Sequence, residues 1–233
     1  LRLLSSIIAT TPNIEVVLTG DQSLKKRNMS KLISLMNEFG AEFYPKNKVF
    51  LPLKIISSDM PIGIKFNSGV SSQIKSACIL SGLNSFGKTT IIEKIRSRDH
   101  TEKMVSNSPN VIKIKNSKDK REIKIIGKSH LEPFNIKIPG DPSSAAFFIA
   151  LTLLVKNSSL KIKNVGLNPT RIGFLDIMKK AGGKIKFKNI KNKKGEPFGD
   201  IYIKSSKLKP LRVTKKFYVR CVDEFPIIFV ISS

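Results

Sequence analysis

The feature that most constrains the fold of this chain is a loose internal repeat. In one copy, a strand predicted over 14–19 is followed by a helix predicted over 30–39. In another copy, a strand predicted over 160–165 precedes a helix over 173–180. The copies recur about every seventy residues, which exceeds the period of about 20–50 residues that is typical of solenoids. The sequence therefore predicts an α/β (α+β) protein whose repeated unit contains several elements.

The two copies share the way in which the helix ends. Gly40 and Gly182 each follow a methionine by four positions, and glycine commonly terminates helices. A new strand is predicted directly afterwards, over 41–44 and 184–187. A middle copy reads as a strand over 89–95 and a helix that begins at 100. There Ser108-Pro109 replaces the glycine pair, so the middle helix is expected to end early.

Each copy is also predicted to hold a second helix, over 71–83 and over 142–155. Asp141 is placed to cap the latter, and Pro142 occupies its first turn. Segments 111–115 and 200–204 alternate like strands.

The formal net charge of +25 raises the possibility of a nucleic-acid-binding protein. That alternative predicts a clustered basic face and a steep salt dependence of affinity. The lysines, however, are spread along the chain, and aromatic residues make up only 7% of it, which leaves few rings for base stacking. We therefore interpret the charge as mostly compositional, and we expect neither nucleic acid nor membrane as a partner.

Cys78 and Cys221 lie within apolar patterns, which favours reduced core thiols over a disulfide or a metal site. The two histidines show no zinc-site spacing. Because no secretory leader or membrane-spanning stretch is evident, we expect a cytoplasmic protein. The chain opens at Leu1 and stops within the apolar stretch 226–233, so we expect truncation at both ends.

Residues 82–89 match the phosphate-binding-loop pattern of nucleotide-binding proteins. That loop must follow a strand and open a helix. Here the predicted order is helix and then strand, so we expect a simple turn in which Gly82 and Gly87 adopt special backbone angles. A P-loop ATPase is therefore disfavoured.

Several polar loops precede predicted helices. Lys25, Lys26 and Arg27 lie near the start of the 30–39 helix, where the dipole disfavours cations. They indicate either an anion held jointly with the helix N-terminus or solvated surface charge. Ser71, Ser72 and Gln73 open another helix, as residues that bind a phosphate or polyol or simply as caps.

Two further loops carry ionisable groups. We expect Asp99 to cap the middle helix with Glu102 as its capping-box partner, which would leave Arg98 to point at a ligand. Asp223 and Glu224 place two carboxylates beside an apolar run. They are interpreted either as a general base or as a helix cap before Pro226.

In this order, the motifs resemble the EPSP synthases (3-phosphoshikimate 1-carboxyvinyltransferases) of the class II bacterial type. Six ordered blocks carry the resemblance, at 18–27, 71–77, 97–102, 138–147, 168–173 and 222–226. The resemblance implies the enolpyruvyl transferase fold, in which repeated βαβαββ units form two domains with the active site in the cleft between them. It places 1–138 in an N-terminal-side domain and 139–233 in a C-terminal-side domain, each partial.

The resemblance also implies roles for individual residues. Arg27 would bind the phosphate of phosphoenolpyruvate, and Arg98 would bind the phosphate of shikimate 3-phosphate. Asp223 would hydrogen-bond the shikimate hydroxyls and accept the proton of the attacking 5-hydroxyl. The remaining shikimate 3-phosphate contacts would come from Ser71, Ser72 and Gln73, with Gln73 also near phosphoenolpyruvate. Glu224 matches the motif without an assigned chemistry, and Arg2 resembles the arginine that closes a loop motif absent here.

The implied reaction is addition followed by elimination, with no metal or organic cofactor, in a monomeric enzyme. We expect the 233-residue chain alone to be inactive. Three departures from the family pattern occur, at Asn28 after Arg27, at Lys88, and at the pair Ser108-Pro109. The related transferase that acts on UDP-N-acetylglucosamine uses a catalytic cysteine in a Gly/Arg-rich loop. Neither Cys78 nor Cys221 lies in such a loop, so this alternative is disfavoured.

Overall fold

The computed structural model describes residues 1–213 and 215–232. By its internal contacts the chain forms two compact units. The first contains 1–96 and 104–133, and the second contains 97–103 and 134–233. This division falls at 133/134 rather than at the expected 138/139, and it groups 97–103 with the second unit. The two-domain assignment itself stays a prediction.

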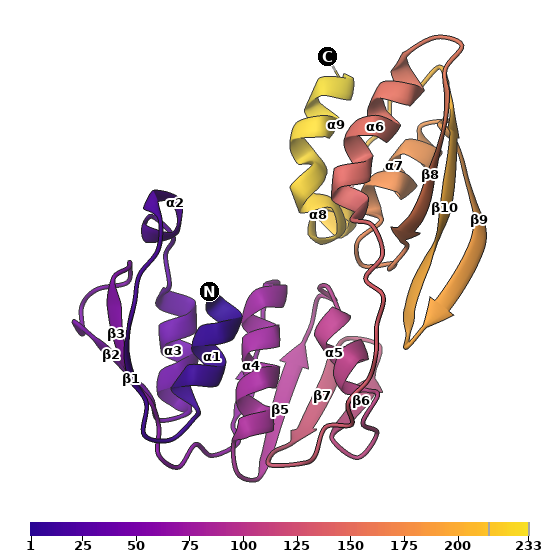
Figure 1. Ribbon diagram of the computed structural model, residues 1–233. Coiled ribbons are helices and arrows are strands. Elements are labelled where there is room, and N and C mark those ends of the chain that lie inside the picture. Colours follow the sequence, from indigo (N-terminus) through magenta and orange to yellow (C-terminus); the bar gives the residue numbers. More distant parts are fainter. Residues whose placement is uncertain (214, 233) are drawn as a thin grey trace. The chain divides into compact units, whose positions relative to one another are not determined.

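The first unit opens with an antiparallel sheet covered by helices (Figure 1). Its elements are α1 (Arg2–Ala9), β1 (Glu15–Leu18), α2 (Gln22–Lys25), α3 (Ser30–Glu38), β2 (Glu42–Tyr44) and β3 (Leu53–Ile56), with strand order β1-β3-β2. The α3 helix forms because Leu32, Leu35 and Met36 recur on one face, and all three are buried. Gly40 follows α3 with a φ of +90°, a conformation that glycine adopts without a Cβ penalty.

A four-stranded sheet completes the first unit. Its elements are β4 (Lys65–Asn67), α4 (Ser72–Asn84), β5 (Lys88–Glu93), α5 (His100–Val105), β6 (Ile112–Asn116) and β7 (Arg121–Ile126), and α5 begins in the segment assigned to the second unit. The strand order is β4-β5-β7-β6, with β4 parallel to β5 and the other pairs antiparallel. As predicted, α5 is short at six residues.

The second unit packs helices on a three-stranded antiparallel sheet of order β8-β10-β9. Its further elements are α6 (Pro142–Leu154), β8 (Ser159–Gly166), α7 (Gly173–Lys180), β9 (Lys184–Lys193), β10 (Glu196–Lys204), α8 (Lys215–Cys221), the 3-10 turn η1 (Val222–Glu224) and α9 (Phe225–Ser232). Asp141 caps α6 as predicted, because its Oδ2 accepts a hydrogen bond from the Ser144 amide at 3.1 Å.

The predicted repeat is confirmed in all three of its copies. Each copy runs helix, strand, helix, strand, strand, as α4-β5-α5-β6-β7 does in the middle. Each copy contributes three strands in this order, and its last strand, which is β3, β7 or β10, lies between its first two strands in the sheet. The middle copy also contains β4, which completes a βαβαββ unit.

The phosphate-loop match at 82–89 lies in the disfavoured order, because α4 precedes it and β5 begins within it at Lys88. Gly87 has the expected positive φ of +80°. The prediction for Gly82 was wrong, since Gly82 lies within α4 without a positive φ. Glycine is required there for space, because a Cβ would lie 2.8 Å from the Thr89 Cβ.

Both cysteines are buried thiols, as predicted. Burial raises the pKa of Cys78, and it raises the pKa of Cys221 to about 11. Within the described residues, no helix has both the length and the apolar character needed to cross a membrane.

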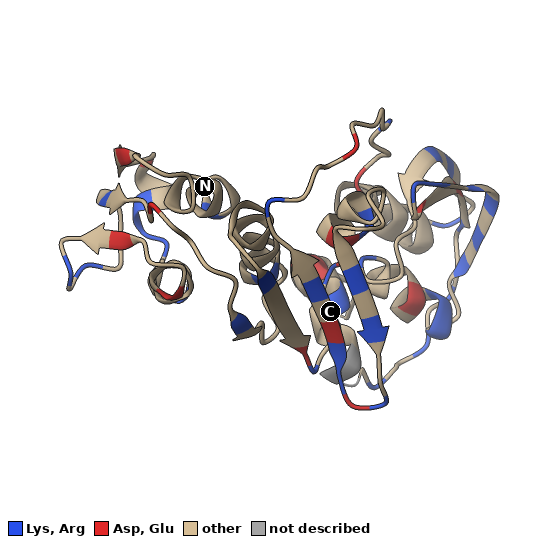
Figure 2. Ribbon diagram, turned by 90° about the horizontal axis from the view of Figure 1, so that it is seen from below, with Lys and Arg blue, Asp and Glu red and all other residues tan. Residues whose placement is uncertain are grey.

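Lys and Arg residues occur on helices, strands and loops throughout the described chain (Figure 2). One cluster was nevertheless missed by the sequence analysis. On one face of the β8-β10-β9 sheet, a hollow of about 650 Å³ is lined by Tyr202 and five lysines, namely Lys161, Lys184, Lys186, Lys188 and Lys204. The cluster arises because alternate residues of neighbouring strands share a face, and Lys204 lies directly opposite Lys184.

Candidate active site

The N-terminus of α4 presents the predicted polar residues. Gly69, with a φ of +60°, precedes Ser71, whose Oγ accepts a hydrogen bond from the Ile74 amide at 3.4 Å. Ser71 is thus the N-cap, and Ser72 and Gln73 occupy the first turn. The unpaired amides and the dipole of a helix N-terminus favour an anion, so this end of α4 suits a phosphate-bearing ligand.

The loop that carries Arg27 differs from its predicted form. Residues 22–25 form the one-turn helix α2, which Asp21 caps by accepting from the Leu24 amide at 2.7 Å. Lys25 and Lys26 therefore lie at the C-terminus of a helix, where cations are favoured, and not at the start of α3. Their position needs no bound anion to explain it. Arg27 follows this turn and is exposed.

Arg2 joins these two parts of the first unit. Its Nη1 donates to Gln73 Oε1 at 2.7 Å, and its Nη2 donates to the Asn28 carbonyl at 3.1 Å. One guanidinium thereby holds the first turn of α4 against the residue that follows Arg27. The sequence had singled out Arg2 only by resemblance, because a pairing across 71 residues leaves no local pattern.

A shallow hollow of about 400 Å³ opens beside the same helix end. Ser71 lines it, together with Lys31 and the 66–70 segment, whereas Ser72 and Gln73 do not. Lys31 is an exposed cation in the first turn of α3, and no local motif in the sequence marks it. The hollow therefore combines a helix N-cap hydroxyl with a lysine.

The second unit brings Arg98 and Asp223 together. The Arg98 Nη2 donates to Asp223 Oδ2 in an ion pair across 125 residues of sequence. The Asp223 side chain keeps 48% of its surface exposed, so it remains accessible to a ligand. Both residues belong to one compact unit, whereas the predicted division placed them in different domains.

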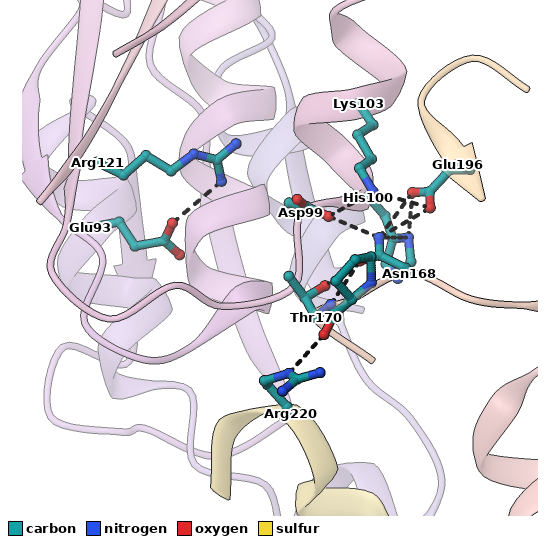
Figure 3. A network of polar contacts seen from close by, with 10 residues as sticks. Glu93, Asp99, His100, Lys103, Arg121, Asn168, Thr170, Glu196 and Arg220 are labelled. Atoms are coloured by element: carbon teal, nitrogen blue, oxygen red, sulfur yellow. Dashed lines mark hydrogen bonds and ion pairs between the residues drawn. The ribbon is translucent and has the colours of Figure 1, made fainter. Parts of the chain in front are cut away.

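A polar network holds the residues that follow Arg98 (Figure 3). Asn168 Nδ2 donates to the buried Asp99 Oδ1 at 2.8 Å and to Glu196 Oε2 at 3.1 Å. His100 Nδ1 lies 2.6 Å from Glu196 Oε1, and Asn168 Oδ1 accepts from the Thr170 hydroxyl at 2.7 Å. The network fixes 99–100 to the β8–α7 loop and to the start of β10, and thereby fixes the backbone from which Arg98 extends.

The network also sets the charge of Glu196. Burial alone would raise the pKa of this carboxyl, but the hydrogen bond with His100 and the neighbouring Lys103 charge hold the pKa below its ordinary value. Glu196 is therefore a carboxylate at neutral pH. Within the described residues, no group of three or more metal-ligating side chains comes together.

The predicted site residues thus fall into two groups, one in each unit. Ser71, Ser72 and Gln73 lie together, and Arg2 connects them to the loop of Arg27. Arg98 and Asp223 form the other group.

The arrangement of these elements is that of an enolpyruvyl transferase. A crystal structure of the enolpyruvyl transferase NikO from Streptomyces tendae superimposes on 98% of this chain with a TM-score of 0.72. This chain covers 52% of the NikO chain, and the two sequences are 15% identical, so the match concerns the fold alone.

The chain belongs to the EPSP synthase (3-phosphoshikimate 1-carboxyvinyltransferase) family, whose model matches residues 1–232. It is 40% identical over its full length to a 3-phosphoshikimate 1-carboxyvinyltransferase of Novosphingobium aromaticivorans, of which it covers 53%. The corresponding protein of Bacillus subtilis is 38% identical over the full length of this chain and is 54% covered. An EPSP synthase structure from Acinetobacter baumannii matches with a TM-score of 0.82 and 33% identity, over 99% of this chain and 51% of that one.

These comparisons confirm the resemblance drawn from the six sequence blocks. The chain spans about half the length of the curated relatives that it matches.

Proposed function

We propose that the protein transfers the enolpyruvyl group of phosphoenolpyruvate to the 5-hydroxyl of shikimate 3-phosphate. The observation that carries the proposal is the Arg98–Asp223 pair. A cation suited to a phosphate and a carboxylate suited to a hydroxyl proton meet at one place. Family membership supports the choice of reaction.

In this proposal each predicted residue has a distinct task. Arg27 binds the phosphate of phosphoenolpyruvate, and Arg98 binds that of shikimate 3-phosphate. Ser71, Ser72 and Gln73 hold shikimate 3-phosphate, with Gln73 also near phosphoenolpyruvate. Because Arg98 is paired with Asp223, the incoming phosphate displaces the carboxylate from the guanidinium. Asp223 then accepts hydrogen bonds from the ring hydroxyls.

The reaction proceeds by addition and elimination. The 5-hydroxyl oxygen bonds to the second carbon of phosphoenolpyruvate while the methylene carbon gains a proton, and Asp223 accepts the hydroxyl proton. Loss of phosphate, together with a proton from the new methyl group, then restores the double bond. Cations stabilise this sequence because both substrates are multiply anionic and the leaving group is phosphate. The proposal requires no metal or organic cofactor.

The proposal is tested by phosphate release from phosphoenolpyruvate, using protein expressed from its complete reading frame. Shikimate 3-phosphate and UDP-N-acetylglucosamine are offered separately as acceptors. Release with shikimate 3-phosphate alone is expected, with a loss of at least 100-fold in kcat for Asp223→Ala. The control is Lys46→Ala, which removes an exposed cation in the turn after β2 and should leave the rate of phosphate release unchanged. Release with the UDP-sugar alone would overturn the acceptor.

We also propose that the protein is a cytoplasmic monomer that binds neither nucleic acid nor membrane. The lysine face of the β8-β10-β9 sheet is the observation that most favours the nucleic-acid alternative. A titration with single-stranded RNA at two salt concentrations separates the two cases. We expect weak RNA binding that Lys184→Gln and Lys186→Gln leave unchanged. An RNA affinity that depends steeply on salt, and that loses this dependence in these variants, would favour the nucleic-acid-binding alternative.

A further inference from the structure

Glu224, the neighbour of Asp223, has an environment that the proposed reaction does not explain. Its side chain lies in η1 and the residue is only 2% exposed. Its Oε1 accepts a hydrogen bond from the Ser143 hydroxyl. Its Oε2 is buried without a hydrogen-bond partner among the described residues. A buried carboxyl is costly unless it is neutral or well paired, so its retention beside Asp223 calls for a physical reason.

Ser143 connects Glu224 to two other elements of the second unit. Arg171 Nη2 donates to the Ser143 hydroxyl at 2.7 Å and to Asp141 Oδ1 at 2.7 Å. Asp141 is the cap of α6, and Arg171 belongs to the β8–α7 loop. A continuous chain of hydrogen bonds therefore runs from the α6 cap through Arg171 and Ser143 to η1.

The preceding residue of η1, Asp223, forms the ion pair with Arg98. Asp223 is half exposed, whereas the next residue, Glu224, is buried and hydrogen-bonded to Ser143. A short turn has little freedom when one of its side chains is fixed by a buried network. The direction of the Asp223 carboxylate therefore depends on the hold that Ser143 and Arg171 exert on Glu224.

We propose that Glu224, held by Ser143 and Arg171, is the positioning residue that aims the Asp223 carboxylate at the substrate hydroxyl. Glu224 performs this task through its hydrogen bond to Ser143 and through its shape. The inference rests on the proposed function, since it assigns Glu224 a role only relative to the base Asp223.

The electrostatics of the turn favour the protonated form of Glu224 more than water would. Burial raises the pKa of its carboxyl, and the negative charge of Asp223 raises it further, while the Ser143 hydrogen bond and the positive charges of Arg171 and Arg98 oppose them. Burial raises the pKa of the neighbouring Cys221 thiol to about 11. Ionisation of Glu224 would place a second negative charge beside the base.

Glu224→Gln, Glu224→Ala and Ser143→Ala test the proposal in the protein expressed from its complete reading frame. Glutamine keeps the shape and the acceptor for Ser143, so kcat should stay within threefold of the original. Glu224→Ala and Ser143→Ala both release the turn. We expect kcat to fall at least 30-fold in Glu224→Ala and at least 5-fold in Ser143→Ala, with little change in the KM for phosphoenolpyruvate. Ser144→Ala is the matched control, because that hydroxyl bonds to Asp141 and not to Glu224.

The pH profile of kcat supplies a readout that a merely structural role would not move. Because burial raises the pKa of Glu224, its ionisation should lower kcat as pH rises through that raised pKa, and Glu224→Gln should remove this fall. Equal losses in the Gln and Ala variants, or an unchanged pH profile in the Gln variant, would overturn the inference. If the unaltered protein released no phosphate with shikimate 3-phosphate, the proposed function would fail instead, which keeps the two failures distinguishable.

Discussion

The buried ion pair beneath the α4 end of the candidate site leads to a quantitative prediction. Lys75 Nζ lies 2.8 Å from Glu93 Oε1, and neither side chain has exposed surface. Lys75→Met would leave the Glu93 carboxylate buried, with Arg121 Nη1 still 3.5 Å from Glu93 Oε2. Breaking a buried pair costs about 3–5 kcal/mol. Because Arg121 stays, we expect the lower end, about 3 kcal/mol.

The assay follows the thiol of Cys78, which lies one turn beyond Lys75 on α4 and is fully buried. Its labelling rate reports how often α4 opens, since a buried thiol reacts only in the open state. A loss of about 3 kcal/mol corresponds to an opening equilibrium, and hence a labelling rate, about 100-fold higher. Measurements are made in a Cys221→Ala background, so that Cys78 is the only thiol within residues 1–233.

Lys46→Met is the control, because its pair with Glu42 is largely exposed, and it should not change the rate measurably. The double variant Lys75→Met/Glu93→Leu should recover only part of the protection, because it removes the buried carboxylate but also takes Glu93 away from Arg121. An increase below tenfold for Lys75→Met would refute the reasoning.

Two further predictions concern the second unit. The pKa of Glu196 is lowered in the folded protein, so the stability that this carboxylate contributes is fully present above the ordinary pKa near 4.5 and is lost as pH falls through the folded pKa. Glu196→Gln should therefore make the free energy of unfolding in urea decline less between pH 6 and pH 3. An unchanged decline would contradict this. Lys184 faces Lys204 directly across β9 and β10, so Lys184→Glu should stabilise the unit by about 0.5 kcal/mol in urea unfolding, whereas a loss of stability would argue against repulsion on this face.

Local sequence signals predicted the helices whose ends are marked by a capping residue, a proline or a glycine. The spacing of Leu32, Leu35 and Met36 and the glycine at 40 located α3, and Asp141 with Pro142 located the start of α6. The one-turn helix α2 was missed because four residues offer no periodicity to read. Its cap, Asp21, is the signal that could have found it.

Long-range pairings account for what the sequence could not show about the site. Arg98 and Asp223 were each selected from a local motif, but nothing local indicates that they pair across 125 residues. The same holds for Arg2 with Gln73 and for Ser143 with Glu224. The lysine face arises only when three strands align in register, so a linear count of charges made these lysines appear dispersed.

The isolated 233-residue chain offers a further check on the proposed function. The two groups of predicted site residues lie in separate compact units, and the chain spans about half the length of its relatives. We expect no phosphate release from this chain with either acceptor, while shikimate 3-phosphate should still bind weakly to the Arg98 and Ser71–Gln73 regions. Turnover by the isolated chain would contradict this expectation.

The central claim is enolpyruvyl transfer to shikimate 3-phosphate with Asp223 as the base. The most direct measurement supplies ¹³C-labelled phosphoenolpyruvate and shikimate 3-phosphate to the protein expressed from its complete reading frame, and follows the product by NMR. We expect a labelled carboxyvinyl ether at the 5-oxygen and equimolar phosphate, both abolished in Asp223→Ala. Labelled pyruvate without the ether, or an ether formed equally well by Asp223→Ala, would contradict the account.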